Sequence, residues 1–391
     1  MNQRKCRTCR GELFQEPLLS YKNMPKGAQF FPGPDEIKSE KGVDLDIFQC
    51  SACGLVQLSI EPVPYYREVI RSAGISDAMK SFRAGQFSEF ISKYSLASKK
   101  ILELGCGKGE YLSIMNGLGV DAYGIEYSDE SVEDCRKLGL KVEKAYIDSS
   151  LVRLKNAPFD SFYILNFLEH MPNAVDVLKG IWANLADKAV GLVEVPNFDM
   201  IIRNKMFAEF IPDHLFYFTR DTLLNTLSLA GFDVIECVDI WHDYIISARV
   251  RKNPVINTAV MSQVKSSINL SSFYEQEKLL KSNISKYLAG LKGKKVAVWG
   301  AGHQALALIS LTGMASQIEY IVDSAPFKQG RYSPATHIPI VAPEQLLSQP
   351  VDSLIIMAGG YSEEVAKIVK NRYSGKMSLA ILRDSGPEPI I

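Results

Sequence analysis

Two histidines in this chain directly follow carboxylates, an arrangement that suits proton transfer. His214 follows Asp213 in the aromatic-rich stretch IPDHLFYFT, and His170 follows Glu169 in FLEHMPN. Histidine is the usual general base near neutral pH, and a neighbouring carboxylate stabilises its imidazolium form. Each dipeptide alone is a weak indication, because a histidine that only lines a core gives the same pattern.

A glycine-rich turn, ILELGCGKGEYL, predicts a ligand site at the end of a strand. The strand ends at Leu104, and Gly105, Gly107 and Gly109 then let the backbone approach a ligand before a helix begins. The spacing G-x-G-x-G departs from the G-x-G-x-x-G of dinucleotide sites. A generic Rossmann-type turn that binds another ligand remains the alternative.

Two glutamates near this turn indicate which ligand it binds. Glu103 lies two residues before Gly105, where a carboxylate can meet the amino group of an amino-acid-like ligand. Glu126 ends the next predicted strand, where its carboxylate can accept hydrogen bonds from two ribose hydroxyls. Together they favour S-adenosylmethionine (SAM), which has a ribose and an amino-acid tail but no pyrophosphate.

The N-terminal part of the chain carries two C-x-x-C pairs. In a reducing compartment such pairs predict a tetrahedral, structural Zn²⁺ site, with a redox dithiol as the alternative. We expect Gly11 and Gly54 to allow the turns after the pairs, and the Gly/Pro-rich stretch between the pairs to be a looped insertion. The four predicted ligands are Cys6, Cys9, Cys50 and Cys53.

Composition limits the kind of partner. The 44 Lys and Arg residues balance the 44 Asp and Glu residues, so net charge does not favour nucleic acid or an anionic membrane. The sequence has neither a signal-peptide pattern nor an apolar stretch of membrane-spanning length, which predicts a soluble, cytoplasmic protein. With 391 residues, several domains are expected.

The pattern of elements predicts an α/β protein. From residue 99 to 197, buried-type strands alternate with helices, which is typical of a parallel, doubly wound sheet. A helix and two more strands continue it over residues 221–250. A long polar helix before residue 292 is expected to be a connector, and a second α/β unit begins at KKVAVWGAG.

The glycine turn with its two glutamates resembles the cofactor site of class I SAM-dependent methyltransferases. That resemblance implies a Rossmann-like fold in which Tyr146 flanks adenine. It also implies that Asn166 and Phe167, at the end of the fourth strand, lie under the methionine part of the cofactor.

Over essentially the whole chain, the order of modules resembles the sugar C-methyltransferases of deoxysugar biosynthesis, and VDSAPFKQGRYSPATHIPI is the most specific match. Those enzymes methylate C3 of nucleotide-linked 4-keto-6-deoxyhexoses. The resemblance implies a zinc ribbon-like module (1–75), a SAM-dependent methyltransferase domain (76–252), a helical connector (253–292) and a C-terminal Rossmann-like substrate or lid domain (293–391).

The same resemblance implies residue roles. His214 removes the proton alpha to the ketone, Asp213 stands in place of the family's glutamate, and His170 supports the enolate oxygen. The carbanion-like carbon then attacks the methyl group in line. The predicted substrate contacts are Glu169, Asn197, Tyr217, Asp323, Lys328, Arg331 and Tyr332. A C-terminal domain that serves only as a lid or dimer surface is the alternative for the last four.

Several positions depart from the family pattern. Ile211 and Pro212 stand where a tyrosine is expected, Ile70 replaces a second tyrosine, and Gln304 replaces a lysine. Two other functions therefore stay open: O-methylation of a surface-polysaccharide or nucleotide-sugar precursor, and a non-catalytic SAM-binding scaffold. The expected partner is a nucleotide-linked sugar or related small acceptor, and the protein is expected to be a monomer or homodimer.

Overall fold

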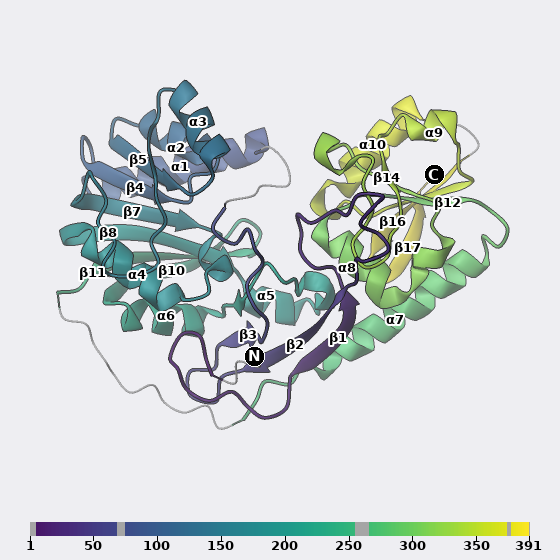
Figure 1. The fold of residues 1–391 in the computed structure, drawn as a ribbon, viewed down its shortest axis with the longest axis horizontal. Coiled ribbons are helices and arrows are strands. Elements are labelled where there is room, and N and C mark those ends of the chain that lie inside the picture. Colours follow the sequence, from purple (N-terminus) through teal and green to yellow (C-terminus); the bar gives the residue numbers. More distant parts are fainter. Residues whose placement is uncertain (1–4, 69–74, 255–265, 374–376, 391) are drawn as a thin grey trace. The chain divides into compact units, whose positions relative to one another are not determined.

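The computed structural model describes residues 5–68, 75–254, 266–373 and 377–390 (Figure 1). Within these residues the chain forms two compact units. The first comprises Met1–Pro17, Ile47–Ile201 and His214–Ile268, and the second comprises Leu18–Asp46, Ile202–Asp213 and Asn269–Ile391. The chain therefore passes from one unit to the other after residues 17, 46, 201, 213 and 268. The domain boundaries expected at residues 75, 252 and 292 stay predictions.

The first unit is built on a sheet whose described strands follow the order β10-β11-β8-β7-β4-β5-β6. Strands β4 to β8 pair in parallel, as the alternating pattern predicts. β11 runs antiparallel to both β8 and β10, and the short turn between β10 and β11 can join these two strands only as antiparallel neighbours. The strands are β4 (Lys100–Leu104), β5 (Asp121–Glu126), β6 (Lys141–Lys144), β7 (Phe159–Leu165), β8 (Leu185–Pro196), β10 (Phe232–Ile240) and β11 (Ile245–Lys252).

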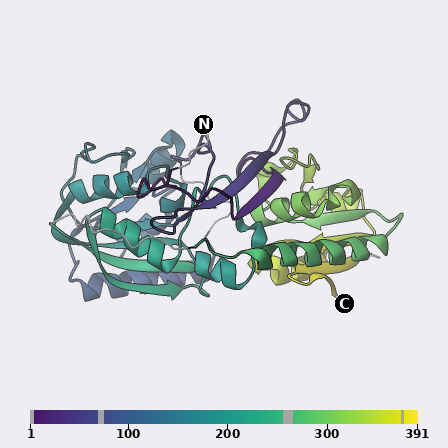
Figure 2. The ribbon, with the colours of Figure 1, turned by 90° about the horizontal axis from the view of Figure 1, so that it is seen from below.

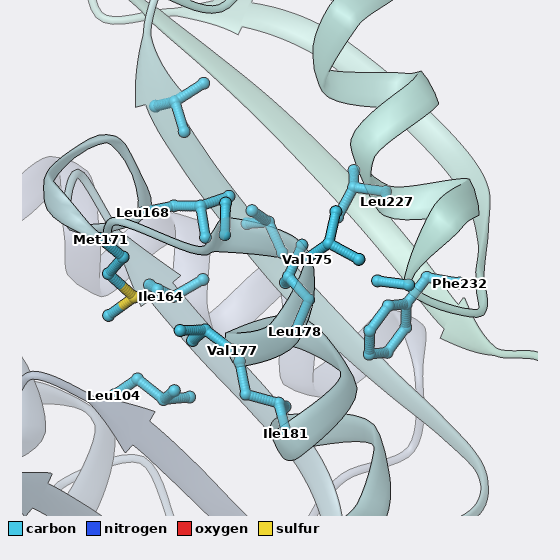
Figure 3. Packing of buried hydrophobic residues seen from close by; sticks show 14 of the residues in the cluster. Leu104, Ile164, Leu168, Met171, Val175, Val177, Leu178, Ile181, Leu227 and Phe232 are labelled. Carbon is cyan, nitrogen blue, oxygen red and sulfur yellow. The ribbon is translucent and has the colours of Figure 1, made fainter. Parts of the chain in front are cut away.

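Buried apolar side chains on both faces of this sheet explain why it is covered by helices on both sides. One cluster joins Ile164 of β7, Leu178 of α4, Leu227 of α6 and Phe232 of β10 (Figure 3). A second cluster packs α1 and α2 against the opposite side chains of the same strands. The helices are α1 (Asp77–Lys93), α2 (Glu110–Asn116), α3 (Asp129–Lys137), α4 (Ala174–Ala183), α5 (Phe198–Arg203) and α6 (Arg220–Leu229), with short 3-10 turns at Leu168–His170 and Phe207–Glu209.

A buried ion pair fixes α1 to the sheet. Arg83 Nη1 lies 2.5 Å from Glu194 Oε2 of β8, and both side chains are fully buried. Gln86 and Ser247 donate further hydrogen bonds to the other oxygen of Glu194. These bonds satisfy the Glu194 carboxylate and offset part of the cost of burying its charge, whereas Nε and Nη2 of Arg83 are buried without a hydrogen-bond partner among the described residues.

The second unit contains another sheet, with the order β14-β13-β12-β15-β16-β17 in the described residues. Its strands run parallel except β17, which pairs antiparallel with β16. The strands are β12 (Val296–Trp299), β13 (Ile321–Val322), β14 (Ile340–Val341), β15 (Ser353–Ile356), β16 (Ser378–Arg383) and β17 (Gly386–Ile390), and the helices are α7 (Ser271–Ala289), α8 (His303–Thr312), α9 (Gln345–Ser348) and α10 (Ser362–Arg372), with 3-10 turns at Met314–Gln317, Pro326–Lys328 and Gly359–Tyr361.

The predicted polar connector forms α7, which packs beside β17 and α8 of the second unit instead of standing apart (Figure 2). Its buried residues Phe273, Leu280, Ile284 and Leu288 recur at helical spacing and form the packing face. In the described parts of the chain, no helix is both long enough and apolar enough to cross a membrane.

The stretch between the two C-x-x-C pairs contains strands that the looped-insertion hypothesis missed. β1 (Leu19–Met24) of the second unit pairs with β2 (Val43–Gln49). In the first unit, the end of β2 pairs with β3 (Val56–Leu58), which pairs with β9 (Phe216–Tyr217). The loop prediction was right only for the Gly/Pro-rich segment between β1 and β2.

Candidate functional site

The four cysteines of the two C-x-x-C pairs converge in the first unit. Their sulfur atoms all lie within 4.8 Å of one another, with 3.7 Å between Cys6 and Cys53 and 3.5 Å between Cys9 and Cys50. Four thiolates at 2.3 Å from a tetrahedral zinc ion would lie about 3.8 Å apart. The donor set and its spacing therefore fit a zinc ion.

The turn after the first pair differs from the prediction. Arg10, not Gly11, adopts the left-handed backbone conformation, with φ of 63°, whereas Gly54 does so after the second pair, with φ of 80°. Gly11 serves another purpose, because a Cβ atom there would lie 2.8 Å from Cβ of Ala52. The glycine lets the two turns approach one another.

A cavity at the carboxyl ends of β4, β5 and β7 brings together half of the predicted cofactor residues. Gly105, Glu126, Tyr146 and Phe167 all line it. The space that protein atoms leave empty there is about 240 Å³, which includes space open to solvent. The remaining lining residues are Arg67, Leu104, Ile125, Tyr127, Ala145, Ile147 and Met171.

The glycine turn wraps around the Glu126 carboxylate. Glu126 Oε2 accepts a hydrogen bond from the Gly107 amide at 2.9 Å, and Oε1 accepts from the amides of Tyr127 and Ser128 at 2.8 and 3.0 Å. All three predicted glycines have positive φ, and a Cβ atom at Gly109 would lie 2.5 Å from the Leu140 side chain. These contacts explain why the turn needs glycine and how Glu126 is held at the cavity.

Glu103 and Asn166 flank the same strand ends. Glu103 is buried, and its Oε2 accepts a hydrogen bond from the Tyr163 hydroxyl at 2.9 Å. Asn166 has φ of 48°, and its buried side-chain oxygen has no hydrogen-bond partner among the described residues. A buried acceptor without a partner is costly, and a bound polar ligand would satisfy it. The site therefore fits a polar cofactor such as SAM.

The two predicted catalytic histidines lie beside each other in the first unit. The ring centroids of His170 and His214 are 4.7 Å apart in an edge-to-face arrangement. His170 Nε2 lies 3.9 Å from Glu169 Oε1, and the His170 side chain is 26% exposed. His170 can therefore contact a small molecule from solvent.

Glu169 is the most unusual member of this group. Its side chain is 1% exposed, and its Oε2 has no hydrogen-bond partner among the described residues. Burial raises the pKa of Glu169 to about 8, because the charged carboxylate loses its hydration. The proximity of this buried acid to two imidazoles makes the group suited to proton transfer.

Asp213 and Tyr217, which flank His214, have clear packing partners. Asp213 Oδ2 accepts a hydrogen bond from the Ala28 amide at 2.8 Å, within the second unit. The Tyr217 ring centroid lies 6.4 Å from that of His214 and 5.5 Å from that of Phe198. The catalytic role of Asp213 and the substrate role of Tyr217 stay predictions.

The other predicted substrate residues make internal contacts. Asn197 binds the Asp243 carbonyl through its side-chain nitrogen and the Met200 amide through its side-chain oxygen. In the second unit, Lys328 is buried and lies 3.1 Å from Asp323.

Arg331 and Tyr332 belong to the same part of the second unit. Arg331 is exposed, and the Tyr332 backbone binds the Pro32 carbonyl. The substrate role predicted for Asn197, Asp323, Lys328, Arg331 and Tyr332 stays a prediction.

The positions that depart from the family pattern have varied surroundings. Ile211 and Pro212 are buried, and Gln304 donates a hydrogen bond to Glu209 within the second unit. Ile70 lies outside the described residues. Sequence reasoning missed Arg67 and Tyr127 of the cavity, although the run Tyr65-Tyr66-Arg67 placed aromatic and planar cationic groups together.

Two family models match the chain. A model described as "Methyltransferase domain" matches residues 79–237, and one described as "C-methyltransferase C-terminal domain" matches residues 253–380. The first match contains the cofactor cavity and the histidine pair, except for Arg67. The second covers most of the second unit.

Individual proteins are also similar to parts of this chain or to nearly all of it. The chain is 22% identical over 386 residues to the C-methyltransferase NovU of Streptomyces niveus, covering 92% of this chain and 91% of that protein. It is 30% identical over 148 residues to a ubiquinone biosynthesis O-methyltransferase of Burkholderia multivorans, covering 35% of this chain and 63% of the relative. A solved SAM-dependent methyltransferase from Clostridium acetobutylicum covers 44% of this chain and 92% of its own at 12% identity, with a TM-score of 0.36. The chain is thus similar to a methyltransferase domain and to a C-methyltransferase C-terminal domain in successive segments, and to the C-methyltransferase NovU over nearly its whole length.

Proposed function

We propose that this enzyme methylates a carbon atom next to the ketone of a nucleotide-linked 4-keto-6-deoxy sugar. The observation that carries this proposal is the pair of adjacent imidazoles, His170 and His214. His170 follows Phe167, a residue of the cofactor cavity, by one 3-10 turn, so the pair belongs to the same strand end as the cofactor site.

The chain's own residues would hold the cofactor at the glycine turn. Glu126 would bind the ribose hydroxyls, Tyr146 would flank the adenine, and Glu103 and Asn166 would bind the amino-acid end. SAM supplies an electrophilic methyl group when it is bound. The protein's part is to exclude water and to fix the acceptor carbon in line with that group.

Proton removal is the step that the histidines support. A neutral imidazole of His214 would take the proton alpha to the ketone, and His170 would donate a hydrogen bond to the enolate oxygen. The buried Glu169 carboxyl beside His170 would hold that ring in its orientation. Imidazole is the side chain that most readily gives or takes a proton near neutral pH, which suits acid and base roles.

We also propose that the four converging cysteines bind a structural Zn²⁺ ion. The cluster offers four sulfur ligands and no further site for a substrate, as in closed structural zinc sites. The ion would connect the two C-x-x-C turns, which are separated by 40 residues in the sequence.

The experiment that tests the function is transfer of label from methyl-labelled SAM to a panel of nucleotide-linked 4-keto-6-deoxy and ordinary hexoses. We expect label at a non-exchangeable carbon of a keto sugar. His214→Asn should reduce turnover by about 100- to 10,000-fold, the usual contribution of a general base. His242→Asn, which alters an exposed histidine of the same unit, is the matched control.

Exchange with solvent separates carbon from oxygen methylation. Only carbon methylation requires removal of the alpha proton. The wild-type enzyme should therefore incorporate deuterium from D₂O into the keto sugar, and His214→Asn should not. Label that appears only as an O-methyl group, or full turnover by the variant, would contradict the proposal. O-methylation is the second candidate, because buried Ile211 and Pro212 stand where the C-methyltransferase pattern has a tyrosine.

A further inference from the structure

Arg67 occupies an unusual position among three tyrosine rings of the first unit. Its guanidinium carbon lies 5.2 Å from the ring centroid of Tyr66, 5.5 Å from that of Tyr127 and 5.4 Å from that of Tyr146. The rings of Tyr66 and Tyr127 stand edge-on to Tyr146, at 6.0 and 6.2 Å between centroids. These contacts hold a planar cation in a fixed place.

This group is part of the wall of the cofactor cavity. Arg67, Tyr127 and Tyr146 line the cavity together with Glu126. Tyr127 directly follows Glu126, the residue suited to the ribose, so the base attached to that ribose would extend toward the three rings. Arg67 itself comes from the segment that follows β3 and lies outside the residues matched by the methyltransferase domain model.

The chemistry of this wall suits a nucleobase. Bases stack on tyrosine rings and on the flat face of arginine, and a guanidinium can donate hydrogen bonds in the same plane. Arg67 Nε is buried and has no hydrogen-bond partner among the described residues. A cofactor oxygen that lies in the plane of the guanidinium would satisfy this donor while the base lies on the guanidinium face.

We propose that Arg67 is a positioning residue that covers the adenine of the methyl donor and fixes it against Tyr127 and Tyr146. This inference rests on the proposed use of SAM, but it does not depend on the identity of the methyl acceptor. A lysine could not replace Arg67 fully, because its ammonium group has no flat face to lie on a base.

Calorimetric titration of the purified full-length protein with SAM, S-adenosylhomocysteine and adenosine tests this proposal. We expect Arg67→Ala to weaken binding of all three ligands by a similar factor, about 10-fold, because they share the base. The affinity of Arg67→Lys for each ligand should lie between that of Arg67→Ala and that of the wild type. Arg136→Ala, at an exposed arginine of α3 in the same unit, should bind like the wild type.

The possible outcomes are separable. Weaker binding of SAM with unchanged binding of adenosine would overturn the assignment to the base, and so would wild-type or tighter binding by Arg67→Ala. The unfolding temperatures of the variants show whether a variant binds weakly only because it is misfolded. If Arg67→Ala is misfolded, Arg67→Lys provides the test, and wild-type affinity of Arg67→Lys would overturn a role for the flat guanidinium. Failure of label transfer to sugars, with the binding ratios as expected, would contradict the proposed acceptor and leave the role of Arg67 intact.

Discussion

At the scale of single residues, Glu169 couples the site to the stability of the fold. Burial raises the pKa of Glu169 from 4.5 to about 8, so the folded protein keeps a proton that the unfolded chain loses between these values. The free energy of unfolding therefore falls as pH rises from 4.5 to about 8, by at most about 1.4 kcal/mol per pH unit from this group.

Glu169→Gln should flatten this dependence, because glutamine carries no ionisable proton. Urea unfolding of the wild type and the variant at pH 6 and pH 8 measures the effect. We expect the variant to lose about 2 kcal/mol less than the wild type between the two pH values. Glu133→Gln, at an exposed glutamate, should keep the wild-type dependence of the free energy of unfolding on pH. The same dependence in Glu169→Gln and the wild type would show that the Glu169 carboxyl is already ionised at pH 6.

The sequence could predict candidate site residues whose place in the fold follows from local spacing. Gly105 and Glu126 follow from the strand–turn–helix pattern, because parallel strands end at one edge of their sheet, whereas Tyr146 and Phe167 were implied by the resemblance to class I SAM-dependent methyltransferases. Arg67 could not be predicted in this way. It reaches the cavity from a segment outside that pattern, and only tertiary packing brings it there.

At the scale of elements, the two C-x-x-C turns behave as a single structural piece. Each turn is closed by its own hydrogen bonds, Cys6 N to the Gly11 carbonyl and Cys50 N to the Leu55 carbonyl. The Ser51 amide also donates to the Glu12 carbonyl and the Phe14 amide to the Gln49 carbonyl, so the two turns already lie side by side, and a bound metal ion would cross-link them further.

Loss of one ligand should therefore loosen both turns. Cys9→Ser should reduce zinc from about one ion per chain to well below that, as measured by elemental analysis, because a three-cysteine site binds zinc more weakly. We expect the unfolding temperature to fall by about 5–10 °C. Cys237→Ser, at a half-buried cysteine of β10, is the control and should retain its zinc. A wild-type protein that unfolds at the same temperature with and without metal would exclude a structural zinc ion.

Prediction of elements succeeded where apolar periodicity was strong and failed where pairing is long-range. The helices and parallel strands of the first unit follow from their pattern. The short strands β1, β3 and β9 carry little periodicity of their own, and β9 pairs with β3, a strand far away in the sequence. The short turn between β10 and β11 likewise makes these two strands antiparallel, which the strand pattern alone did not predict.

At the scale of the whole molecule, the second unit is assembled from three separate stretches of chain. Phe210 illustrates this, because it is fully buried, with its ring 6.0 Å from that of Tyr21 and 6.2 Å from that of Phe273. These residues come from Ile202–Asp213, Leu18–Asp46 and Asn269–Ile391, respectively.

Phe210→Ala should therefore destabilise the second unit, although residue 210 lies next to first-unit sequence. We expect a cost of about 3–5 kcal/mol, the usual value for a buried phenylalanine. When Trp182 and Trp241 are replaced by phenylalanine, the fluorescence of Trp299 reports on the unfolding of the second unit. In Phe210→Ala its unfolding transition should move to a lower urea concentration. Phe232→Ala, in the first-unit core, is the matched control, and an unshifted Trp299 transition in Phe210→Ala would contradict this assembly.

The repeated passage of the chain between units also has a consequence for protein synthesis. On the ribosome, residues 18–46 emerge more than 200 residues before Asn269–Ile391, with which they must pack. At roughly 5–20 residues per second, β1 can pair early with β2 but waits about 10–45 s for Asn269–Ile391. During that interval its apolar side chains Leu19, Tyr21 and Met24, buried in the finished protein, are exposed, so the nascent chain offers a binding site for chaperones that the mature enzyme does not have.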